Sequence, residues 1–396
     1  MNMNEQMKES EESILHTYNR FPVVFEKGQG CYLYDSEGKE YLDFAAGIAV
    51  NSLGYHYPGY DEALKDQIDK LMHISNLYYN EPIIEAGAKL VKASKMSKAF
   101  FTNSGTEAIE GALKAAKKYA YVRDGHADHE IIAMNHSFHG RSIGALSVTG
   151  TAHYREPFEP LMGGVKFADF NDLESVKAQI TDKTCAIITE VVQGEGGIYP
   201  AKKEFLEGLR QICDEKDIML IFDEIQCGMG RTGHYFAWQA YGVKPDIMTS
   251  AKALGCGVPV GAFVLSEKAA KASLEPGDHG TTYGGNPFVC AAVSKVFDIY
   301  ENDKIIEHVQ EMTPYLEQKL DEIVAKHECA ATRRGMGFMQ GIVIQGRPVG
   351  EVVKAALVKG LLVISAGSDV LRIVPPLVIT KEHIDKMAAI LDECME

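Results

Sequence analysis

Long apolar runs are missing from this sequence. No stretch approaches the length of a bilayer-spanning helix, and the first residues, MNMNEQMKESEES, lack the basic and apolar regions of a secretory signal. The eight cysteines form no CxxC pair and no regular spacing, which is typical of reduced thiols packed as small apolar residues. We therefore expect a cytoplasmic protein with no disulfide framework and no membrane partner.

An excess of positive charge is missing as well. The formal net charge is −15, so the surface would repel the phosphate backbone of a nucleic acid. There is no GxxxxGK[ST] loop and no HExxH motif, and the 13 histidines show no obvious ligand clustering. We expect no nucleic-acid partner, no P-loop phosphoryl transfer and no metal.

The composition is that of an ordinary globular protein, with 46% apolar and 24% charged residues. A chain of 396 residues exceeds what one hydrophobic core normally supports, so we expect one large and one smaller domain. We place a large domain at 59–290 and a small α+β domain at 291–396. Residues 1–58 contain a hairpin-like stretch, CYLYDSEGKEYLDF, which we expect to pack with the small domain.

The middle of the chain alternates between strand-like and helical patterns, which predicts an α/β domain with a mainly parallel sheet. The segment at 204–215 has the pattern of a helix between two such strands. The strand-like runs lie at 99–102, 130–134, 185–192, 218–222, 246–249 and 260–265.

Polar residues follow several of these strand-like runs directly. Open α/β sheets bind ligands beyond the carboxyl ends of their strands, so these residues are candidates for one shared site. They are Ser104-Gly105-Thr106, Phe138-His139-Gly140-Arg141, Glu190, Glu195, Asp223, Gln226 and Lys252.

Each candidate taken alone also has an ordinary structural explanation. Ser104-Gly105-Thr106 could be a plain helix N-cap or a phosphate site, because free N–H groups at a helix start attract anions. Asp223 could be a solvated loop residue, and an isolated lysine such as Lys252 is usually a surface charge. Together, a buried acid and a lysine 29 residues later suit a cofactor that needs a protonated ring nitrogen and an imine anchor.

The segment GMGRTG at 228–233 matches the GxGxxG fingerprint of dinucleotide-binding proteins. However, no helix pattern begins at its third glycine, and the next aspartate, Asp246, comes only 13 residues after Gly233. We interpret the match as accidental, and a nicotinamide-dependent oxidoreductase stays a remote alternative.

Several longer segments carry a family resemblance. FFTNSGTEAIEGALKAAKKY, HSFHGRSIGALSVTG, DEIQCGMGRTG, SAKALGCGVPVGAF and HGTTYGGNP occur in this order along the chain. Together they resemble the class III (ornithine-type) aminotransferases of the fold-type I pyridoxal phosphate superfamily, over nearly the whole length. The resemblance implies pyridoxal 5′-phosphate (PLP) as cofactor and a homodimer with shared active sites.

The resemblance also implies a role for individual residues. Lys252 would carry PLP as a Schiff base, and Asp223 would hold its ring nitrogen. The other cofactor-binding residues would be Ser104, Gly105, Thr106, Phe138, Ile225, Gln226 and, from the other subunit, Thr282. Substrate contacts would come from Arg141, Thr281, Glu195 and Arg372, the last two acting as a switch between substrates.

Within the family, the best agreement is with members that act on N-acetylornithine. The resemblance therefore implies ping-pong transamination between N-acetylornithine and 2-oxoglutarate, a step of arginine biosynthesis. Ornithine, succinylornithine, 4-aminobutyrate and N-acyl-lysine are the alternative donors, partly because Tyr55 stands where relatives commonly have histidine. A non-catalytic binding protein is disfavoured, since a binder has no need of an imine-forming lysine.

Overall fold

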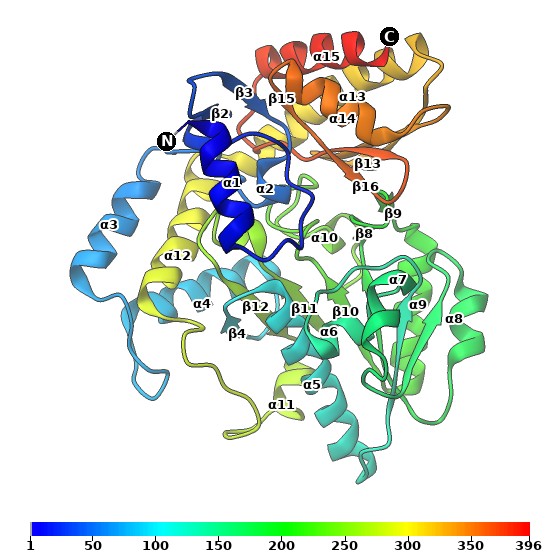
Figure 1. Cartoon of the computed structure of the whole chain (residues 1–396). Helices are drawn as coiled ribbons and strands as arrows, with labels where there is room; N and C mark the ends of the chain where they lie inside the picture. The colour runs from blue at the N-terminus through cyan, green and yellow to red at the C-terminus, as the bar shows by residue number, and fades with distance from the viewer. Residues whose placement is uncertain (1) are drawn as a thin grey trace.

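The computed structural model describes residues 2–396, and its centre is a seven-stranded sheet (Figure 1). The parallel pairs join β6 to β5, β5 to β7, β7 to β10 and β10 to β11, whereas β12 is antiparallel to both its neighbours. The expected α/β fold with a mainly parallel sheet is confirmed. In spatial order the strands are β4 (Lys98–Thr102), β12 (Gly261–Leu265), β11 (Ile247–Ser250), β10 (Met219–Asp223), β7 (Thr184–Glu190), β5 (Glu130–Met134) and β6 (Val165–Ala168).

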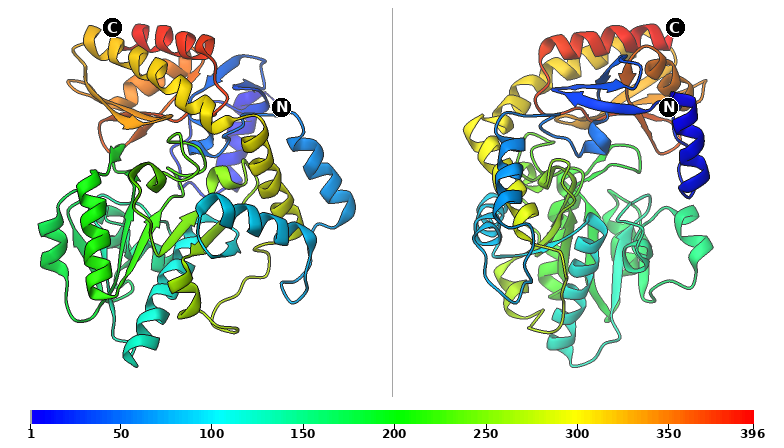
Figure 2. Two further views of the ribbon diagram at one scale, coloured as in Figure 1. Left: turned by 180° about the vertical axis from the view of Figure 1, so that it is seen from behind. Right: turned by 60° about the vertical axis from the view of Figure 1, so that its left-hand side comes forward.

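Helices connect these strands and cover the sheet (Figures 1 and 2). The strand β6 and most of the short helices have no counterpart among the sequence predictions, since their patterns are too short to recognise. The helices are α3 (Tyr60–Lys70), α4 (Glu81–Ser94), α5 (Gly105–Asp124), α6 (Ile143–Ser147), α7 (Ala152–Arg155), α8 (Leu173–Gln179), α9 (Lys203–Lys216), α10 (Trp238–Tyr241), α11 (Glu267–Lys271) and α12 (Pro287–Asn302).

The central strands are buried on both faces. In β10, Met219 and Ile221 belong to the apolar cluster that includes α5, whereas Leu220 and Phe222 belong to the cluster that includes α9. Successive side chains of a strand point to opposite faces, so a strand between two helical layers must be apolar throughout. This requirement explains why these segments form continuous apolar runs.

Helix α5 presents small residues to the sheet and packs against it. It begins at the N-cap Ser104, ends at Gly125 with φ of +74°, and buries five alanines. A Cβ atom placed on Gly111 would lie 2.2 Å from the ring of Phe263 on β12, so only glycine allows this approach. The close packing positions the first turn of α5 at the carboxyl edge of the sheet.

The C-terminal part forms a second, antiparallel sheet in the order β13 (Ala330–Met336), β14 (Met339–Ile344), β17 (Val370–Ile373) and β16 (Ile364–Ala366). Helices α13 and α15 lie side by side against it (Figure 2). Thr380 is the N-cap of α15. The helices of this part are α13 (Ile305–Lys326), α14 (Val349–Val358) and α15 (Lys381–Met395).

The N-terminal segment forms a small sheet that a C-terminal strand extends. Leu361 of β15 (Leu361–Leu362) pairs with Leu42 of β3 in parallel. The polar helix α1 was not expected, because its sequence has no apolar face. Residue 290, where we place a domain boundary, lies within α12, and the division into domains stays a prediction. The elements of this segment are α1 (Met3–Ser13), β1 (Phe25–Gln29), β2 (Tyr32–Asp35), β3 (Glu40–Asp43) and α2 (Ala46–Ala49).

None of the helices within residues 2–396 combines the length and the apolar character that crossing a bilayer requires.

Candidate active site

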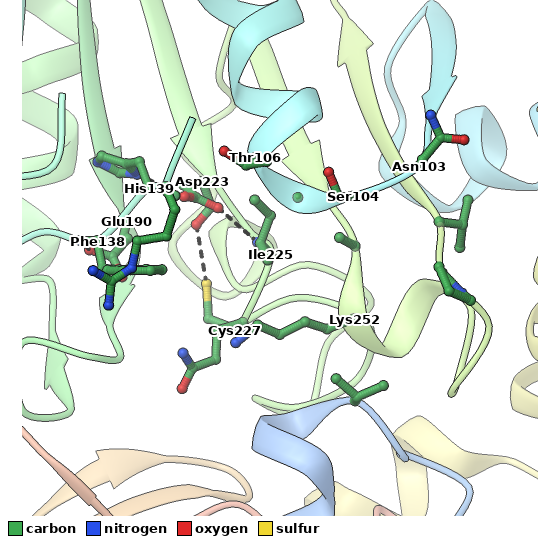
Figure 3. Close-up of a pocket in the computed structure, with 18 of the residues that line it drawn as sticks. Asn103, Ser104, Thr106, Phe138, His139, Glu190, Asp223, Ile225, Cys227 and Lys252 are labelled. Atoms are coloured by element: carbon green, nitrogen blue, oxygen red, sulfur yellow. Dashed lines mark hydrogen bonds and ion pairs between the residues drawn. The ribbon is translucent and has the colours of Figure 1, made fainter. Parts of the chain in front are cut away.

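A cavity of about 510 Å³ lies at the carboxyl edge of the large sheet (Figure 3). Its walls come from segments that follow β4, β5, β7, β10 and β11, which are far apart in the sequence. The predicted residues that line it are Ser104, Gly105, Thr106, Phe138, His139, Gly140, Arg141, Glu190, Asp223, Ile225, Gln226 and Lys252. The predicted residues Glu195, Thr281, Thr282 and Arg372 lie outside this lining.

The first turn of α5 forms one wall of the cavity. Ser104 is the N-cap, and its hydroxyl accepts a hydrogen bond from Glu107 N at 3.3 Å. The first bond along the helix backbone runs from Ala108 N to Ser104 O, so the N–H groups of Gly105 and Thr106 precede the helical ladder. Ser104 therefore caps the helix, and the next two N–H groups remain available for an anion at the positive helix end.

Asp223 ends β10 and is almost fully buried at 3% exposure. One carboxylate oxygen accepts bonds from Ile225 N at 3.0 Å and from the Thr249 hydroxyl at 3.1 Å, and the other lies 2.7 Å from His139 Nδ1. A carboxylate accepts about four hydrogen bonds, so one acceptor position remains for a donor in the cavity. His139 is the partner that the burial of Asp223 requires.

Lys252 follows β11 and extends toward the centre of the cavity (Figure 3). Its backbone φ of +49° lies in the left-handed region, which costs a lysine about 1 kcal/mol and fixes the direction of the side chain. Burial lowers the pKa of the Lys252 amine to about 8. At pH 7 about a tenth of this amine would be neutral, far more than for an ordinary lysine. Lys252 is therefore a competent nucleophile.

Glu190 is a buried carboxyl group beside Asp223, opposite to it in the strand register. Its two oxygens accept hydrogen bonds from Phe138 N at 3.3 Å and Gly194 N at 3.2 Å. Burial, together with the charge of Asp223, raises the pKa of Glu190 well above its ordinary value. Glu190 thus joins the loop of Phe138 to the segment after β7 through these two hydrogen bonds.

Arg141 and Phe138 lie on the loop that follows β5. The Arg141 guanidinium lies 5.4 Å from the centre of the Phe138 ring and 4.0 Å from that of Tyr154. Tyr154 borders a second, neighbouring cavity of about 810 Å³. Arg141 is exposed and contacts aromatic rings rather than a carboxylate, so its planar fork is free to bind an anion.

Glu195 and Arg372 form an ion pair beside the second cavity, which Glu195 also lines. The guanidinium donates to both carboxylate oxygens, at 2.5 and 3.2 Å, and to Gln226 Oε1 at 3.1 Å. Burial alone would raise the pKa of Glu195, but the charge of Arg372 outweighs it and holds the pKa below its ordinary value. Through Gln226, the pair reaches the wall of the first cavity.

The two threonines lie on the loop before α12. The Thr281 hydroxyl accepts bonds from Asn103 Nδ2 at 3.2 Å and Gly284 N at 3.1 Å, and Asn103 lines the first cavity. Thr282 is exposed and does not line the first cavity. The structure thus brings Thr281 near the site and leaves Thr282 on the surface.

The GMGRTG segment packs inside the protein and does not line the cavity. Arg231 is buried at 1% exposure and donates to the carbonyl oxygens of Phe338 and Pro375. Gly230 and Gly233 have positive φ values and shape the turn around it. These contacts give the segment a structural role, joining the large sheet to the C-terminal part.

Two residues of the site were given no role by the sequence analysis. His139 was a candidate by position with no assigned role, and Thr249 was recognised only as part of a strand. The signal for Thr249 is its register, since it lies opposite Asp223 in the parallel pair β10–β11. Tyr55 lies outside the cavity lining, where its hydroxyl donates to Asp43 at 2.8 Å.

Residues 14–395 match the family model described as aminotransferase class-III. The chain belongs to the class III aminotransferases. It is 47% identical to an acetylornithine aminotransferase of Clostridium acetobutylicum, over 98% of this chain and 100% of that protein. It is 44% identical to a succinylornithine transaminase of Yersinia pseudotuberculosis, over 94% and 92% respectively. The fold is similar to that of an ornithine aminotransferase from Toxoplasma gondii, with a TM-score of 0.95 and 28% identity over 100% of this chain and 94% of that one. That structure has PLP at partial occupancy in its active site.

Class III aminotransferases use PLP, and the residues of the cavity fit this cofactor. The free N–H groups at the start of α5 suit a phosphate, the remaining acceptor position of Asp223 suits a protonated ring nitrogen, and Lys252 suits an aldehyde. The chain is therefore a PLP-dependent aminotransferase with the fold of its family.

Proposed function

We propose that this chain is an N-acetylornithine:2-oxoglutarate 5-aminotransferase, which transfers the side-chain amino group of N-acetylornithine to 2-oxoglutarate and forms glutamate. The name and full-length match of the relative from Clostridium acetobutylicum support this donor. The structural observation that carries the proposal is the Glu195–Arg372 pair. Arg372 can bind a substrate carboxylate in addition to Arg141, and Glu195 blocks this second position when it pairs with Arg372.

The two substrates place their carboxylates differently with respect to the amino group that reacts. In the donor, the α-carboxylate lies at the far end of the molecule, where Arg141 would bind it while Glu195 neutralises Arg372. In glutamate, the α-carboxylate lies next to the amino group, so Glu195 would release Arg372 to bind it. Arginine suits both positions because its planar fork binds a carboxylate with two hydrogen bonds.

PLP, when bound, supplies the aldehyde that takes up the amino group and the ring that accepts an electron pair. The amine of Lys252 would bind the aldehyde carbon of the cofactor. Once the substrate amine has displaced it, the same amine would act as the general base that carries a proton between the substrate and the cofactor. Asp223, oriented by His139 and Thr249, would keep the ring nitrogen protonated. Ser104, Gly105 and Thr106 would hold the phosphate, Gln226 the phenolic oxygen, and Phe138 and Ile225 the faces of the ring.

We further propose a homodimer in which Thr282 reaches the phosphate in the partner's site, while Thr281 contacts substrate. The surface around Thr282 supports this assembly. Large apolar side chains lie exposed on this loop and on the segment between α3 and α4, including Leu77 at 87%, Tyr79 at 96% and Tyr283 at 63% exposure. Such surfaces are typical of protein interfaces.

The role in arginine biosynthesis, the cytoplasmic location and the division at residues 58 and 290 belong to the same proposal.

A donor screen with 2-oxoglutarate as acceptor tests the function directly. The purified enzyme is given N-acetylornithine, succinylornithine, ornithine, 4-aminobutyrate and an N-acyl-lysine, and glutamate formation is followed. We expect the highest kcat/KM for N-acetylornithine. A higher value for succinylornithine would replace it with the second candidate, which the Yersinia relative favours.

A further inference from the structure

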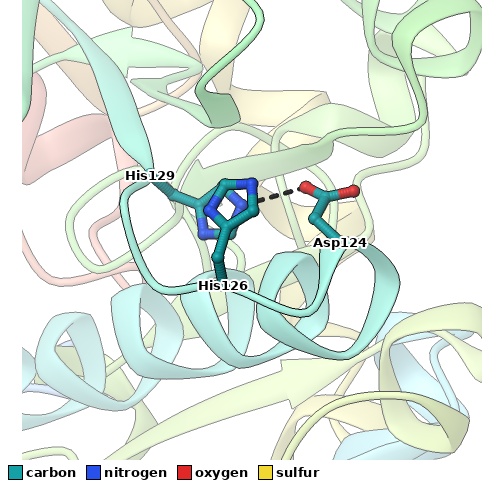
Figure 4. A group of neighbouring side chains, drawn as sticks. All are labelled: Asp124, His126 and His129. Carbon is teal, nitrogen blue, oxygen red and sulfur yellow. Dashed lines mark hydrogen bonds and ion pairs between the residues drawn. The ribbon is translucent and has the colours of Figure 1, made fainter.

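A cluster of one aspartate and two histidines lies far from the cofactor cavity, at the opposite end of α5. Figure 4 shows its three side chains. Asp124 is the last residue of this helix, and His126 and His129 follow in the turn toward β5. The ligand atoms of the three side chains all lie within 4.8 Å of one another. Our expectation that the histidines do not cluster is wrong for this segment, because the αL turn at Gly125 folds the chain back.

Two of the three groups, Asp124 and His129, already lie close to the positions that ligands of one metal ion would take. His129 Nε2 lies 2.9 Å from an oxygen of Asp124. Two ligand atoms on a tetrahedral zinc ion lie about 3.3 Å apart, given bonds of about 2.0 Å, so these two groups need to move by only a few tenths of an ångström. A metal ion would take the place of the hydrogen atom between these two groups, and the neutral ring of His129 would then carry its proton on Nδ1.

His126 supplies the third group from the solvent side. Its ring lies parallel to that of His129, with 4.7 Å between the ring centres and 15° between the planes (Figure 4). His126 is exposed, so its side chain can turn toward the gap between Asp124 and His129 without disturbing the core. His129, by contrast, is buried and held in place. The cluster therefore combines two preorganised groups with one adjustable group.

Charges of both signs surround the cluster, and Lys117 donates to the carbonyl oxygen of His129 at 3.1 Å. Arg123 holds the pKa of Asp124 below its ordinary value, so this group is a carboxylate near neutral pH. The carboxyl end of α5 adds partial negative charge. Arg123 itself lies against Asp124, at 2.6 Å from each oxygen, and its positive charge opposes a metal ion. Asp128 is nearby but is paired with Lys183.

We propose that Asp124, His126 and His129 form a binding site for a divalent transition-metal ion such as Zn²⁺. Two imidazoles and one carboxylate are a ligand set that zinc prefers, with water completing the tetrahedron. The site stabilises the turn between α5 and β5. It takes no part in transamination, because the 20 residues of α5 separate it from the phosphate-binding turn by about 30 Å.

Calorimetric titration of the holoenzyme with ZnCl₂ tests this proposal, using untagged protein freed of metal by a chelator. We expect one ion per chain at a micromolar dissociation constant, and a rise of Tm by several degrees at saturating zinc. In His126→Ala this binding weakens at least tenfold and the zinc-dependent rise of Tm disappears. The variant folds and keeps its transaminase activity within about twofold, because His126 is exposed and remote from the cavity.

The control is His16→Ala. His16 is also exposed and lies 2.5 Å from Glu11, but it belongs to no group of three possible ligands within residues 2–396. We expect His16→Ala to bind zinc with the same stoichiometry and dissociation constant as the wild type. Any zinc that binds to the cofactor itself would be equal in the wild type and both variants, so it cannot produce a difference between them. Zinc binding that is absent from the wild type, or unchanged in His126→Ala, overturns the proposal without affecting the proposed transaminase function.

Discussion

The guanidinium of Arg372 on β17 donates two hydrogen bonds to the carboxylate of Glu195, which follows the short strand β8 (Val192–Gln193). The contact joins the two parts of the molecule at the edge of the cavity. Arg372 is 3% exposed and also donates to Ser365 O, so its position is fixed by its own sheet. Glu195 is the partner with more freedom, since its side chain is 27% exposed.

Glu195→Gln should shift substrate preference toward glutamate. The amide cannot neutralise Arg372, which then attracts the α-carboxylate of either substrate and competes with the productive binding of N-acetylornithine. We expect the ratio of kcat/KM for N-acetylornithine to that for glutamate to fall about tenfold, or about 1.4 kcal/mol. Glu317→Gln is the matched control, because Glu317 pairs with Arg333 away from the cavity. An unchanged ratio would remove Glu195 from the proposed switch.

Lys252→Ala should abolish transamination and the visible absorption band of the bound coenzyme. The alanine side chain has no amine to attach the cofactor, so borohydride treatment should label the 252 peptide in the wild type only. The expected loss of kcat is at least about a thousandfold. Lys271→Ala removes an exposed lysine paired with Glu267 and should retain the band. A band that persists in Lys252→Ala would refute the assignment.

Cofactor incorporation should depend on pH through the Lys252 amine. Only the neutral amine attacks an aldehyde, and its pKa is lowered from 10.5 to about 8, chiefly by burial. The rate at which PLP restores absorbance to the apoenzyme should therefore rise about tenfold per pH unit below 8 and level off above it. A rate that continues to rise steeply to pH 10 would show an ordinary lysine instead.

His139→Ala should loosen the cofactor by removing one partner of Asp223. We expect the dissociation constant of PLP to rise about tenfold and kcat to fall by a similar factor, with partial rescue in His139→Asn, which can donate a hydrogen bond. His327→Ala provides the comparison, since His327 is also buried and bonded to an aspartate, Asp392, at 2.7 Å. Both alanine variants should lose stability, but only the first should lose affinity for PLP.

Mixed dimers should reveal whether Thr282 acts in the partner's site. Lys252→Ala and Thr282→Ala chains are each impaired, but a heterodimer of the two contains one site with both native groups. Mixing after partial denaturation should therefore restore activity above the sum of the parents, toward half of the wild-type value per heterodimer. Recovery would be absent if Thr282 served its own chain.

The part of the site that the sequence predicted lies in continuous segments. Ser104-Gly105-Thr106 and Lys252 each follow a recognisable strand, and parallel strands bring their carboxyl ends to one edge whatever the details of packing. The family motifs covered the same residues. For this reason the fold, the cofactor and most of the cavity lining could be predicted without coordinates.

Contacts between distant segments required the tertiary structure. The pairing of His139 with Asp223 depends on how the loop after β5 crosses the sheet, and Arg231 became a buried structural residue only when the C-terminal part packed over it. The cluster of Asp124 with His126 depends on a left-handed turn at Gly125. The alternation of apolar residues along the chain determined which elements form, because burial acts locally on each helix and strand. The hydrogen-bond partners were decided only by three-dimensional packing. A hydrogen bond is lost when the donor–acceptor distance grows by a few tenths of an ångström or the angle at the hydrogen becomes poor, and the sequence does not fix these quantities.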